Sequence, residues 1–286
     1  MEHGTWNVKK PPRPGPLSDA PTQMKYYIIS FDTESTGLST YSDQIVEFGA
    51  VLTLWDAETG VSTMLPQFTE YAHPTHATMS RKAVELTGIT MASLLGKPPI
   101  QTVLDNFLAH VDMVCDDPDV PRLLLSYNGF RYDIPLVVAE LERSGASAIA
   151  YFRQLRLQHA IDLLPFGRAC IDTSILTRKA NGSCSYRLGD VYASVCRCPL
   201  VDAHGAISDS QAVLDILHCP EIQVCFQALV AEAPDNDHCQ NPMAIVRTAV
   251  ARITAKKSGL GETRKTSKRV LDMVRTHTEK KRKRLH

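Results

Sequence analysis

From position 26 to position 38 the chain reads Tyr26-Tyr27-Ile28-Ile29-Ser30-Phe31-Asp32-Thr33-Glu34-Ser35-Thr36-Gly37-Leu38. The apolar first half predicts a β-strand, and Gly37 predicts a turn after it. Side chains at positions i and i+2 of a strand point to the same face, so Asp32 and Glu34 should lie together. Two such anions repel each other, and a cation bound between them would offset this repulsion. Their hard oxygen atoms favour magnesium or manganese as that cation. The motif therefore indicates a metal site, with a solvated strand end as the ordinary alternative.

The composition is that of a chain that can bury a sizeable core. Of its 286 residues, 44% are hydrophobic, which allows one large domain or two small ones. No apolar run approaches the roughly 20 residues of a membrane span, and residues 1–24 lack the apolar segment of a signal peptide. We therefore expect a soluble, intracellular protein that has no membrane partner.

The eight cysteines are scattered along the chain, and no two of them form a C-x-x-C pair. This spacing argues against a zinc ribbon and against a disulfide framework, so we expect reduced thiols. A zinc site made of Cys196, Cys198, His218 and Cys219 is conceivable, but buried and inert cysteines are the simpler interpretation.

The formal net charge of zero hides an asymmetry along the chain. Residues 247–286 contain 14 Lys and Arg against three acidic residues, a balance of +11, so the remainder carries −11. The run Lys280-Lys281-Arg282-Lys283-Arg284 is typical of nuclear localisation signals or nucleic-acid patches, and a solvated terminus is the alternative. We expect a nuclear protein whose basic tail attracts phosphates in a salt-sensitive way.

The chain divides into three regions by composition. Residues 1–24 include Pro11-Pro12-Arg13-Pro14-Gly15-Pro16 and predict a disordered arm, or less simply a ligand for an SH3-type groove. Residues 25–232 form the predicted folded domain. Residues 233–286 form a basic, partly helical tail, with helices expected at 243–254 and 262–284.

Hydrophobic periodicity and turn residues predict an α/β fold, a mixed five-stranded sheet flanked by helices. Short connections make the first three strands antiparallel, and the continuous apolar run at 122–127 predicts a fourth strand buried on both faces. The expected strands are 26–30, 44–55, 61–71, 122–127 and one near 169–171. The expected helices are 81–86 capped by Ser80, one that begins at Pro98-Pro99 and runs past Val111, 134–144, 188–196 and 206–217.

Two further stretches carry candidate polar groups. Asp133 follows the buried strand and begins a helix, so it should lie at the same sheet end as Asp32 if the two strands are parallel. His204 precedes the last predicted helix, and Asp209 lies in its first turns. Each has an ordinary alternative, a helix N-cap for Asp133 and a surface residue for His204.

Together these residues resemble the DEDDh 3′-to-5′ exonucleases of the ribonuclease H-like superfamily. Their signature is D-x-E on the first strand, an Asp after the fourth strand, and H-x-x-x-x-D on the last core helix. The resemblance covers roughly residues 25–218 and fills all five positions, with Asp32, Glu34, Asp133, His204 and Asp209. Residues 128–136 and 185–189 look most like the three-prime repair exonuclease branch. Residues 31–34 and 45–50 also look like the proofreading subunit of bacterial replicative polymerases.

The resemblance implies two divalent cations, Mg²⁺ or Mn²⁺, as cofactors. Asp32 would bridge them, Glu34 and Asp209 would hold the ion that activates water, and Asp133 would support the second ion through water. His204 would act as general base, because histidine titrates near neutral pH.

By the same resemblance, Leu38 would wedge against the terminal base, Tyr132 would pack on the terminal nucleotide, and Arg131 would contact nucleic acid. Asn128 is a further candidate substrate contact in that loop. The alternatives are core packing for Leu38 and Tyr132, a surface charge for Arg131 and a turn role for Asn128.

The predicted function is therefore hydrolysis of DNA from its 3′ end, with release of nucleoside 5′-monophosphates and a preference for single-stranded or frayed ends. An RNA exonuclease of the same family is the near alternative. An inactive nucleic-acid-binding module is the alternative of another class, and the five intact site residues argue against it. Association with a polymerase and a homodimer are further expectations from the resemblance alone.

Overall fold

The structure, a computed structural model, describes residues 24–232 and 238–257. In this part of the chain a single mixed sheet has the order β3-β2-β1-β5-β6, with β4 paired to β2. Its central strand, β1, is antiparallel to β2 and parallel to β5, and β5 is parallel to β6. The strands are β1 (Lys25–Ser35), β2 (Ile45–Asp56), β3 (Ser62–Met64), β4 (Phe68–Tyr71), β5 (Arg122–Ser126) and β6 (Leu157–Asp162). The predicted α/β fold class is confirmed.

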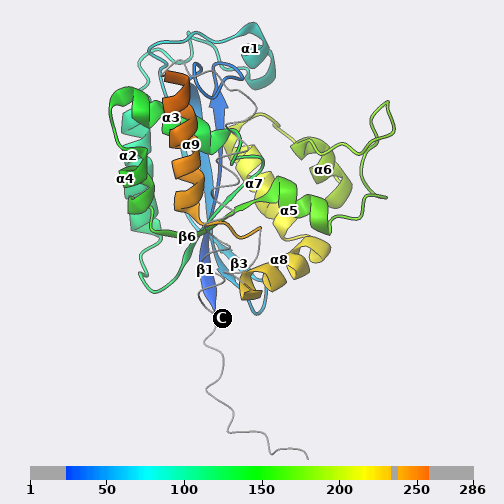
Figure 1. The fold of residues 1–286 in the computed structure, drawn as a ribbon. Coiled ribbons are helices and arrows are strands. Elements are labelled where there is room, and N and C mark those ends of the chain that lie inside the picture. Colours follow the sequence, from blue (N-terminus) through cyan, green and yellow to red (C-terminus); the bar gives the residue numbers. More distant parts are fainter. Residues whose placement is uncertain (1–23, 233–237, 258–286) are drawn as a thin grey trace, which may run out of the picture.

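Helices cover both faces of the sheet, and a further short helix, α1 (Arg81–Thr87), lies at one end of it (Figure 1). One face packs on α2 (Ile100–Val114), α3 (Asp133–Ser144), α4 (Ala148–Gln154) and α9 (Pro242–Lys257). The other packs on α5 (Leu163–Cys170), α6 (Leu188–Val195), α7 (Ala206–Leu217) and α8 (Pro220–Glu232). Among the described helices none is by itself long and apolar enough to cross a membrane, and only the bent pair α7 and α8 would qualify together.

The two cores are divided by the alternation of side chains along β1. Tyr27, Ile29 and Phe31 belong to the core under α2, α3, α4 and α9, whereas Tyr26 and Ile28 belong to the core under α7 and α8. The even-numbered side chains therefore face α7. Continued along the strand, this alternation directs the carboxylates of Asp32 and Glu34 toward α7 as well.

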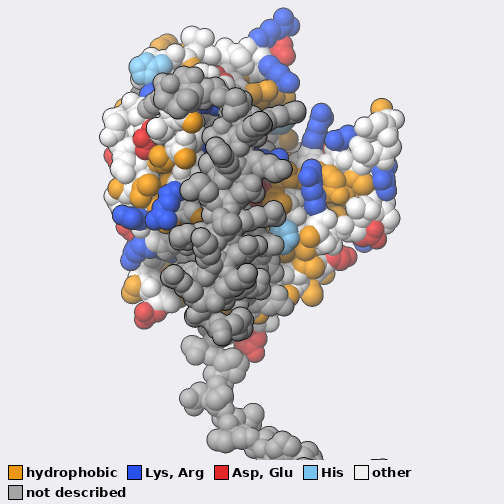
Figure 2. Space-filling view, in the orientation of Figure 1, with side chains coloured by type: hydrophobic (Ala, Val, Ile, Leu, Met, Phe, Trp, Pro, Cys, Tyr) orange, Lys and Arg blue, Asp and Glu red, His pale blue; other side chains and the backbone are white. Residues whose placement is uncertain are grey.

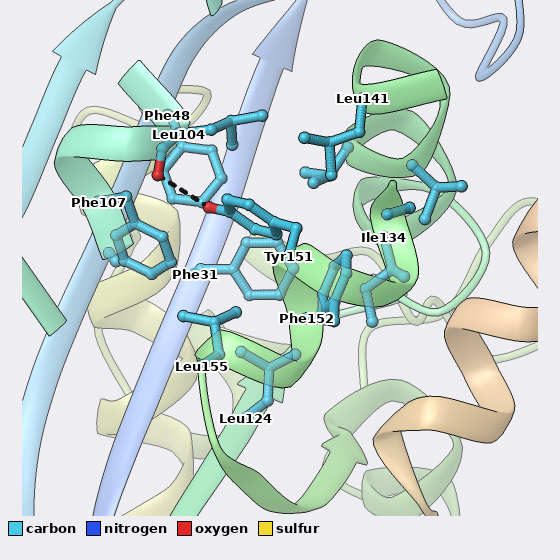
Figure 3. Packing of buried hydrophobic residues seen from close by; sticks show 14 of the residues in the cluster. Phe31, Phe48, Leu104, Phe107, Leu124, Ile134, Leu141, Tyr151, Phe152 and Leu155 are labelled. Carbon is cyan, nitrogen blue, oxygen red and sulfur yellow. Dashed lines mark hydrogen bonds between the residues drawn. The ribbon is translucent and has the colours of Figure 1, made fainter. Parts of the chain in front are cut away.

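Aromatic packing supports β1 from the opposite face (Figure 3). The ring of Phe48 lies 5.9 Å from that of Phe31 and 4.7 Å from that of Phe107. The buried Tyr151 hydroxyl donates a hydrogen bond to the Leu104 carbonyl at 3.1 Å. Because such rings pack in few arrangements, this core fixes the strand that carries the candidate site.

Two predicted strands differ from the structure. The region predicted as one strand at residues 61–71 forms two short strands, β3 and β4. Pro66 lies between them and has no N–H group to donate a hydrogen bond to a neighbouring strand. The sheet therefore has six strands and not five. The prediction of a strand near residues 169–171 is wrong, because these residues form the end of α5 and the position after it. The last strand of the sheet is instead β6, which lies before α5 in the sequence. The signal of β6 was weak because its first half, Leu157-Gln158-His159, is only partly buried.

Helix α9 packs directly against the folded core. Its side chains Ile245, Val246, Ala249 and Ile253 are buried against α3 and α4, and the preceding Gln240 exchanges two backbone hydrogen bonds of 3.0 Å with Ala160 of β6. The helix predicted at residues 243–254 is thus confirmed. The division into residues 25–232 and 233–286 stays a prediction. The arm at residues 1–23, the helix predicted at 262–284 and the run from Lys280 to Arg284 lie outside the described residues.

The packing of α7 on the sheet depends on Gly49, which pairs with Asp32 between the antiparallel strands β1 and β2. A Cβ atom on Gly49 would lie 2.6 Å from the carbonyl carbon of Ala206, at the start of α7. The Ser30 hydroxyl donates to the Ser210 carbonyl at 2.8 Å, and the Ser210 hydroxyl donates to the Gly49 carbonyl at 3.2 Å. The start of α7 is therefore held beside Asp32.

We expect the substitution Gly49→Ala to destabilise the protein by about 1–3 kcal/mol, because the new methyl group meets backbone atoms that cannot move alone. The melting temperature should fall by about 5 °C. The matched control is Gly189→Ala on α6, where a Cβ atom would meet none of the described residues within 4 Å beyond the helix's own backbone. Equal melting temperatures for the two variants in a thermal scan would contradict this account.

Candidate active site

Three of the predicted residues meet at the ends of two parallel strands. Asp32 and Glu34 lie near the end of β1, and Asp133 is the first residue of α3, shortly after β5. The backbone N–H of Thr33 donates to Asp133 Oδ1 at 3.1 Å, and the Thr33 hydroxyl donates to the same atom at 2.6 Å. Asp133 is therefore fixed to the residue between the two acidic residues of β1.

The other two predicted residues come from α7 and the loop before it. The ligand atoms of Glu34, His204 and Asp209 all lie within 4.8 Å of one another. His204 is exposed and has a backbone φ of 69°, an unusual value for a residue other than glycine. The structure thus brings the five residues of the predicted signature to one place.

Burial and mutual repulsion raise the pKa values of these carboxyl groups. The pKa of Asp32 is raised well above its usual range, first by burial and then by Asp133 and Asp209. The pKa of Glu34 rises to about 8 through burial and the neighbouring carboxylates. Burial also raises the pKa of Asp133 to about 6, although its hydrogen bonds from Thr33 oppose the shift. The pKa of Asp209 is raised by burial, against the attraction of His204.

These features fit a divalent cation. The buried Oδ1 atom of Asp209 has no hydrogen-bond partner among the described residues, and an orphaned buried oxygen calls for an explanation such as an ion. The acidic donors are hard oxygens, the ligands that magnesium and manganese prefer. A bound cation would also offset the repulsion that raises the pKa values. Asp32, Glu34, Asp133 and Asp209 are the residues that would hold it.

A further carboxylate, Glu47, was not predicted as part of the site. It lies on β2 opposite Glu34, is 6% exposed, and accepts a hydrogen bond from the Ala206 N–H at 3.4 Å. Burial raises its pKa, and Asp209 adds to the shift. The available signal was the antiparallel pairing of residues 31–35 with 45–50, which places a third acidic side chain beside the D-x-E motif.

The predicted contacts to a terminal nucleotide lie in two loops that touch each other. Leu38 is 76% exposed, which excludes core packing for it. The Tyr132 hydroxyl donates to the Gly37 carbonyl at 2.6 Å and lies 2.6 Å from the Ser35 hydroxyl. The turn that carries Leu38 is thus bonded to the residue before Asp133.

Arg131 and Asn128 lie in the loop between β5 and α3. Arg131 is exposed, and Asn128 has a φ of 63° and donates its backbone N–H to Asp162 Oδ1 at 2.7 Å. Asp162 also accepts from the Leu164 N–H at 3.1 Å as the N-cap of α5. The turn role of Asn128 is therefore seen in the structure, and its contact with substrate stays a prediction.

The geometry does not favour the conceivable zinc site. The sulfur atoms of Cys196 and Cys219 lie 3.6 Å apart, but His218 Nε2 is hydrogen-bonded to the Ser62 hydroxyl at 2.6 Å. Among the described residues, the one group of three possible metal ligands that lie close together is Glu34, His204 and Asp209.

The substitution Glu34→Gln should stabilise the metal-free protein. With a folded pKa of about 8 and an ordinary value of 4.5, Glu34 contributes stability only at low pH, and this contribution is lost as the pH rises through that interval. At pH 7.5 in EDTA the variant should melt about 3–6 °C above the wild type, and Mg²⁺ should raise its melting temperature less.

The control is Glu85→Gln, which alters an exposed carboxylate paired with Arg81 on α1 and should change the melting temperature little. A lower melting temperature for Glu34→Gln in EDTA would show that the carboxyl group of Glu34 does not destabilise the metal-free fold.

The fold and the site define a class of protein. A mixed sheet of this order, with carboxylates gathered where the parallel strands β1 and β5 end, is the arrangement of the ribonuclease H-like nucleases. The RNase T exonuclease family model matches residues 29–217, and the chain belongs to this family. The matched region includes every residue of the candidate site.

Individual proteins are more distant. The chain is 30% identical over 156 residues to a PolC-type DNA polymerase III from Streptococcus pyogenes serotype M1, which covers 54% of this chain and 9% of that polymerase. Escherichia coli exonuclease I, solved with a dT13 oligonucleotide, matches 73% of this chain and 44% of its own with a TM-score of 0.57 and 21% identity. Its complex with dA16 gives a TM-score of 0.58 at 21% identity, with coverages of 73% and 43%. These structural matches establish the likeness of fold alone.

Proposed function

We propose that this protein is a two-metal-ion 3′-to-5′ exonuclease of the DEDDh type that releases nucleoside 5′-monophosphates from DNA. The observation that carries the proposal is the convergence of Asp32, Glu34, Asp133 and Asp209, from β1, α3 and α7, with His204 beside them. Family membership and the oligonucleotide complexes of exonuclease I support it.

Asp32, Glu34, Asp133 and Asp209 would hold two divalent cations, Mg²⁺ or Mn²⁺. When bound, such ions lower the pKa of water and stabilise charge on the leaving 3′ oxygen. His204 lies on an exposed loop next to Glu34 and Asp209, where its ring can take a proton from the attacking water. Glu47 accepts a hydrogen bond from the Ala206 N–H and would position the start of α7.

The loops around the site support the proposed substrate preference. Leu38 is exposed on the turn held by Tyr132, so it can separate the last base from its neighbour, and Tyr132 can pack against that nucleotide. Such a contact requires an unpaired end, which favours single-stranded or frayed DNA. The carboxylates do not distinguish a 2′-hydroxyl, so RNA is the second candidate substrate.

The partners and the location of the protein belong to the same proposal. The 30% identity to part of a PolC-type polymerase supports association with a polymerase as a candidate partnership. The run from Lys280 to Arg284 supports a nuclear location. A homodimer remains an expectation from the family resemblance.

The test uses purified full-length protein with 3′-labelled single-stranded DNA, blunt duplex DNA and single-stranded RNA of the same sequence. With Mg²⁺ or Mn²⁺, we expect labelled mononucleotide first from single-stranded DNA, and none in EDTA or from a strand with a blocked 3′ end. Internal cleavage of the blocked strand, or mononucleotide release in EDTA, would contradict the proposal.

A further inference from the structure

A groove of about 540 Å³ lies between α9, the loop that precedes α3, and helix α5. Its lining combines three arginines with apolar and polar side chains, and those that matter here are Asn128, Phe130, Arg131, Asp162, Arg168 and Arg252. A second groove of about 220 Å³ shares Arg131, Ala249 and Arg252 with the first and adds Tyr41 and Lys256. The two form one surface along α9, which we call the α9 groove.

The α9 groove is positively charged although the rest of the folded domain is acidic. Arg131, Arg168 and Arg252 are all exposed, and none of them forms an ion pair with a described residue. The carboxylate in the lining, Asp162, is 4% exposed and accepts hydrogen bonds from backbone N–H groups. The surface therefore presents cations to an anionic ligand, with its own acidic group turned to the backbone.

Aromatic rings lie beside some of the cations of this surface. Phe130 is partly exposed in the first groove, and the Arg168 guanidinium lies 4.5 Å from the ring centre of Tyr186. In the second groove the Lys256 ammonium lies 5.7 Å from the ring centre of Tyr41. Cations that follow a backbone together with rings on which bases stack are the features of sites for single-stranded nucleic acid.

The α9 groove begins beside the candidate active site. Arg131 lines both of its parts and is two residues from Asp133 in the sequence, and Asn128 lies in the same loop. In Figure 2 Lys and Arg side chains occur beside α9 and over α5 and α6, on the face where α9 lies in Figure 1. A strand with its 3′ end among the carboxylates could therefore continue along α9.

Helix α9 lies outside the region that defines the family. The family model ends at residue 217, and α9 spans Pro242–Lys257. Arg252 and Lys256 are thus contributions of this chain that the comparison with the family does not predict.

We propose that the α9 groove binds the sugar–phosphate backbone of a single DNA strand, upstream of the 3′ end that lies in the active site. This inference rests on the proposed function for the direction of the strand. Arg131, Arg168 and Arg252 contact its phosphates, and Phe130 and Tyr41 offer surfaces for its bases.

The test compares Arg252→Glu with Arg247→Glu. Both arginines are exposed on α9, but Arg247 lines neither part of the groove, so the two variants change the charge of the same helix equally. Binding of a 5′-fluorescein-labelled oligothymidylate of about 20 nucleotides is followed by anisotropy in EDTA, across a salt titration, with full-length protein. Melting temperatures verify that both variants are folded.

We expect Arg252→Glu to weaken binding about tenfold and to lower the slope of log K against log salt by roughly 1, while Arg247→Glu changes the affinity less than about threefold. Equal effects of the two substitutions would overturn the proposal, because they would show attraction to charge alone. Binding needs no cleavage, so a specific loss in Arg252→Glu without any nuclease activity would uphold the groove and refute the nuclease. Normal nuclease activity with equal effects would refute the groove alone.

Discussion

Replacing Asp32 with Asn should lower kcat/KM on a single-stranded DNA 3′ end by about three orders of magnitude or more. Asp32 is the proposed ligand shared by two metal ions, and loss of such a ligand would remove several kcal/mol of transition-state stabilisation. Asp32 is the centre of the carboxylate cluster: its pKa is raised by burial and by four acidic neighbours, and it pairs with Gly49, on which α7 rests. The substitution keeps the shape of the side chain and removes its charge.

The matched control is Asp105→Asn, which makes the same change on the exposed face of α2 and should keep activity within about twofold. Single-turnover rates with a 3′-labelled strand and Mg²⁺ measure both variants. If Asp32→Asn retained a tenth of the wild-type rate, Asp32 would not be a shared ligand and the site would have to be assigned differently.

Replacing His204 with Ala should lower kcat by about 10²- to 10⁴-fold, the usual contribution of a general base, with little change in the affinity for Mn²⁺. His204 is exposed on the loop before α7 and adds nothing to the described core, so the fold should survive the change. Its ring nevertheless lies with Glu34 and Asp209, within reach of a water molecule held there.

Two results would separate the roles open to His204. A tenfold loss of Mn²⁺ affinity, measured by titration calorimetry, would make His204 a metal ligand, which the same three-residue geometry permits. Unchanged kcat would remove it from the reaction. The control is His76→Ala, another exposed histidine in a loop outside the carboxylate cluster, which should change neither quantity.

The sequence allowed the site to be predicted where local rules are strong. The i, i+2 relation of Asp32 and Glu34 follows from strand geometry alone, and the apolar run before Asp133 indicates a buried strand whose end lies near theirs. The positions of α3 and α7 were also predicted well, because each is an apolar periodic segment with a glycine at one end. Gly145 follows the last residue of α3, and Gly205 precedes the first residue of α7. Assembly of the three stretches into one site came from the family resemblance.

What could not be predicted depends on packing between distant segments. Glu47 joins the carboxylates because β2 pairs with β1 in one register, and a shift of one residue would turn its side chain away. Strand β6 lies at an edge of the sheet, where Gln240 forms a bridge to it. Because the first half of the strand is only partly buried, its sequence has a weak apolar pattern. The α9 groove exists only because buried residues such as Val246 and Ile253 hold the helix against α3 and α4.

The most direct test is a crystal structure of the protein with Mn²⁺, with the ions located by their anomalous scattering. We predict two peaks about 4 Å apart, with Asp32 between them, Glu34 and Asp209 at one and Asp133 near the other. A single peak bound by Glu34, His204 and Asp209 without Asp32, or no peak at this end of the sheet, would contradict the two-metal site.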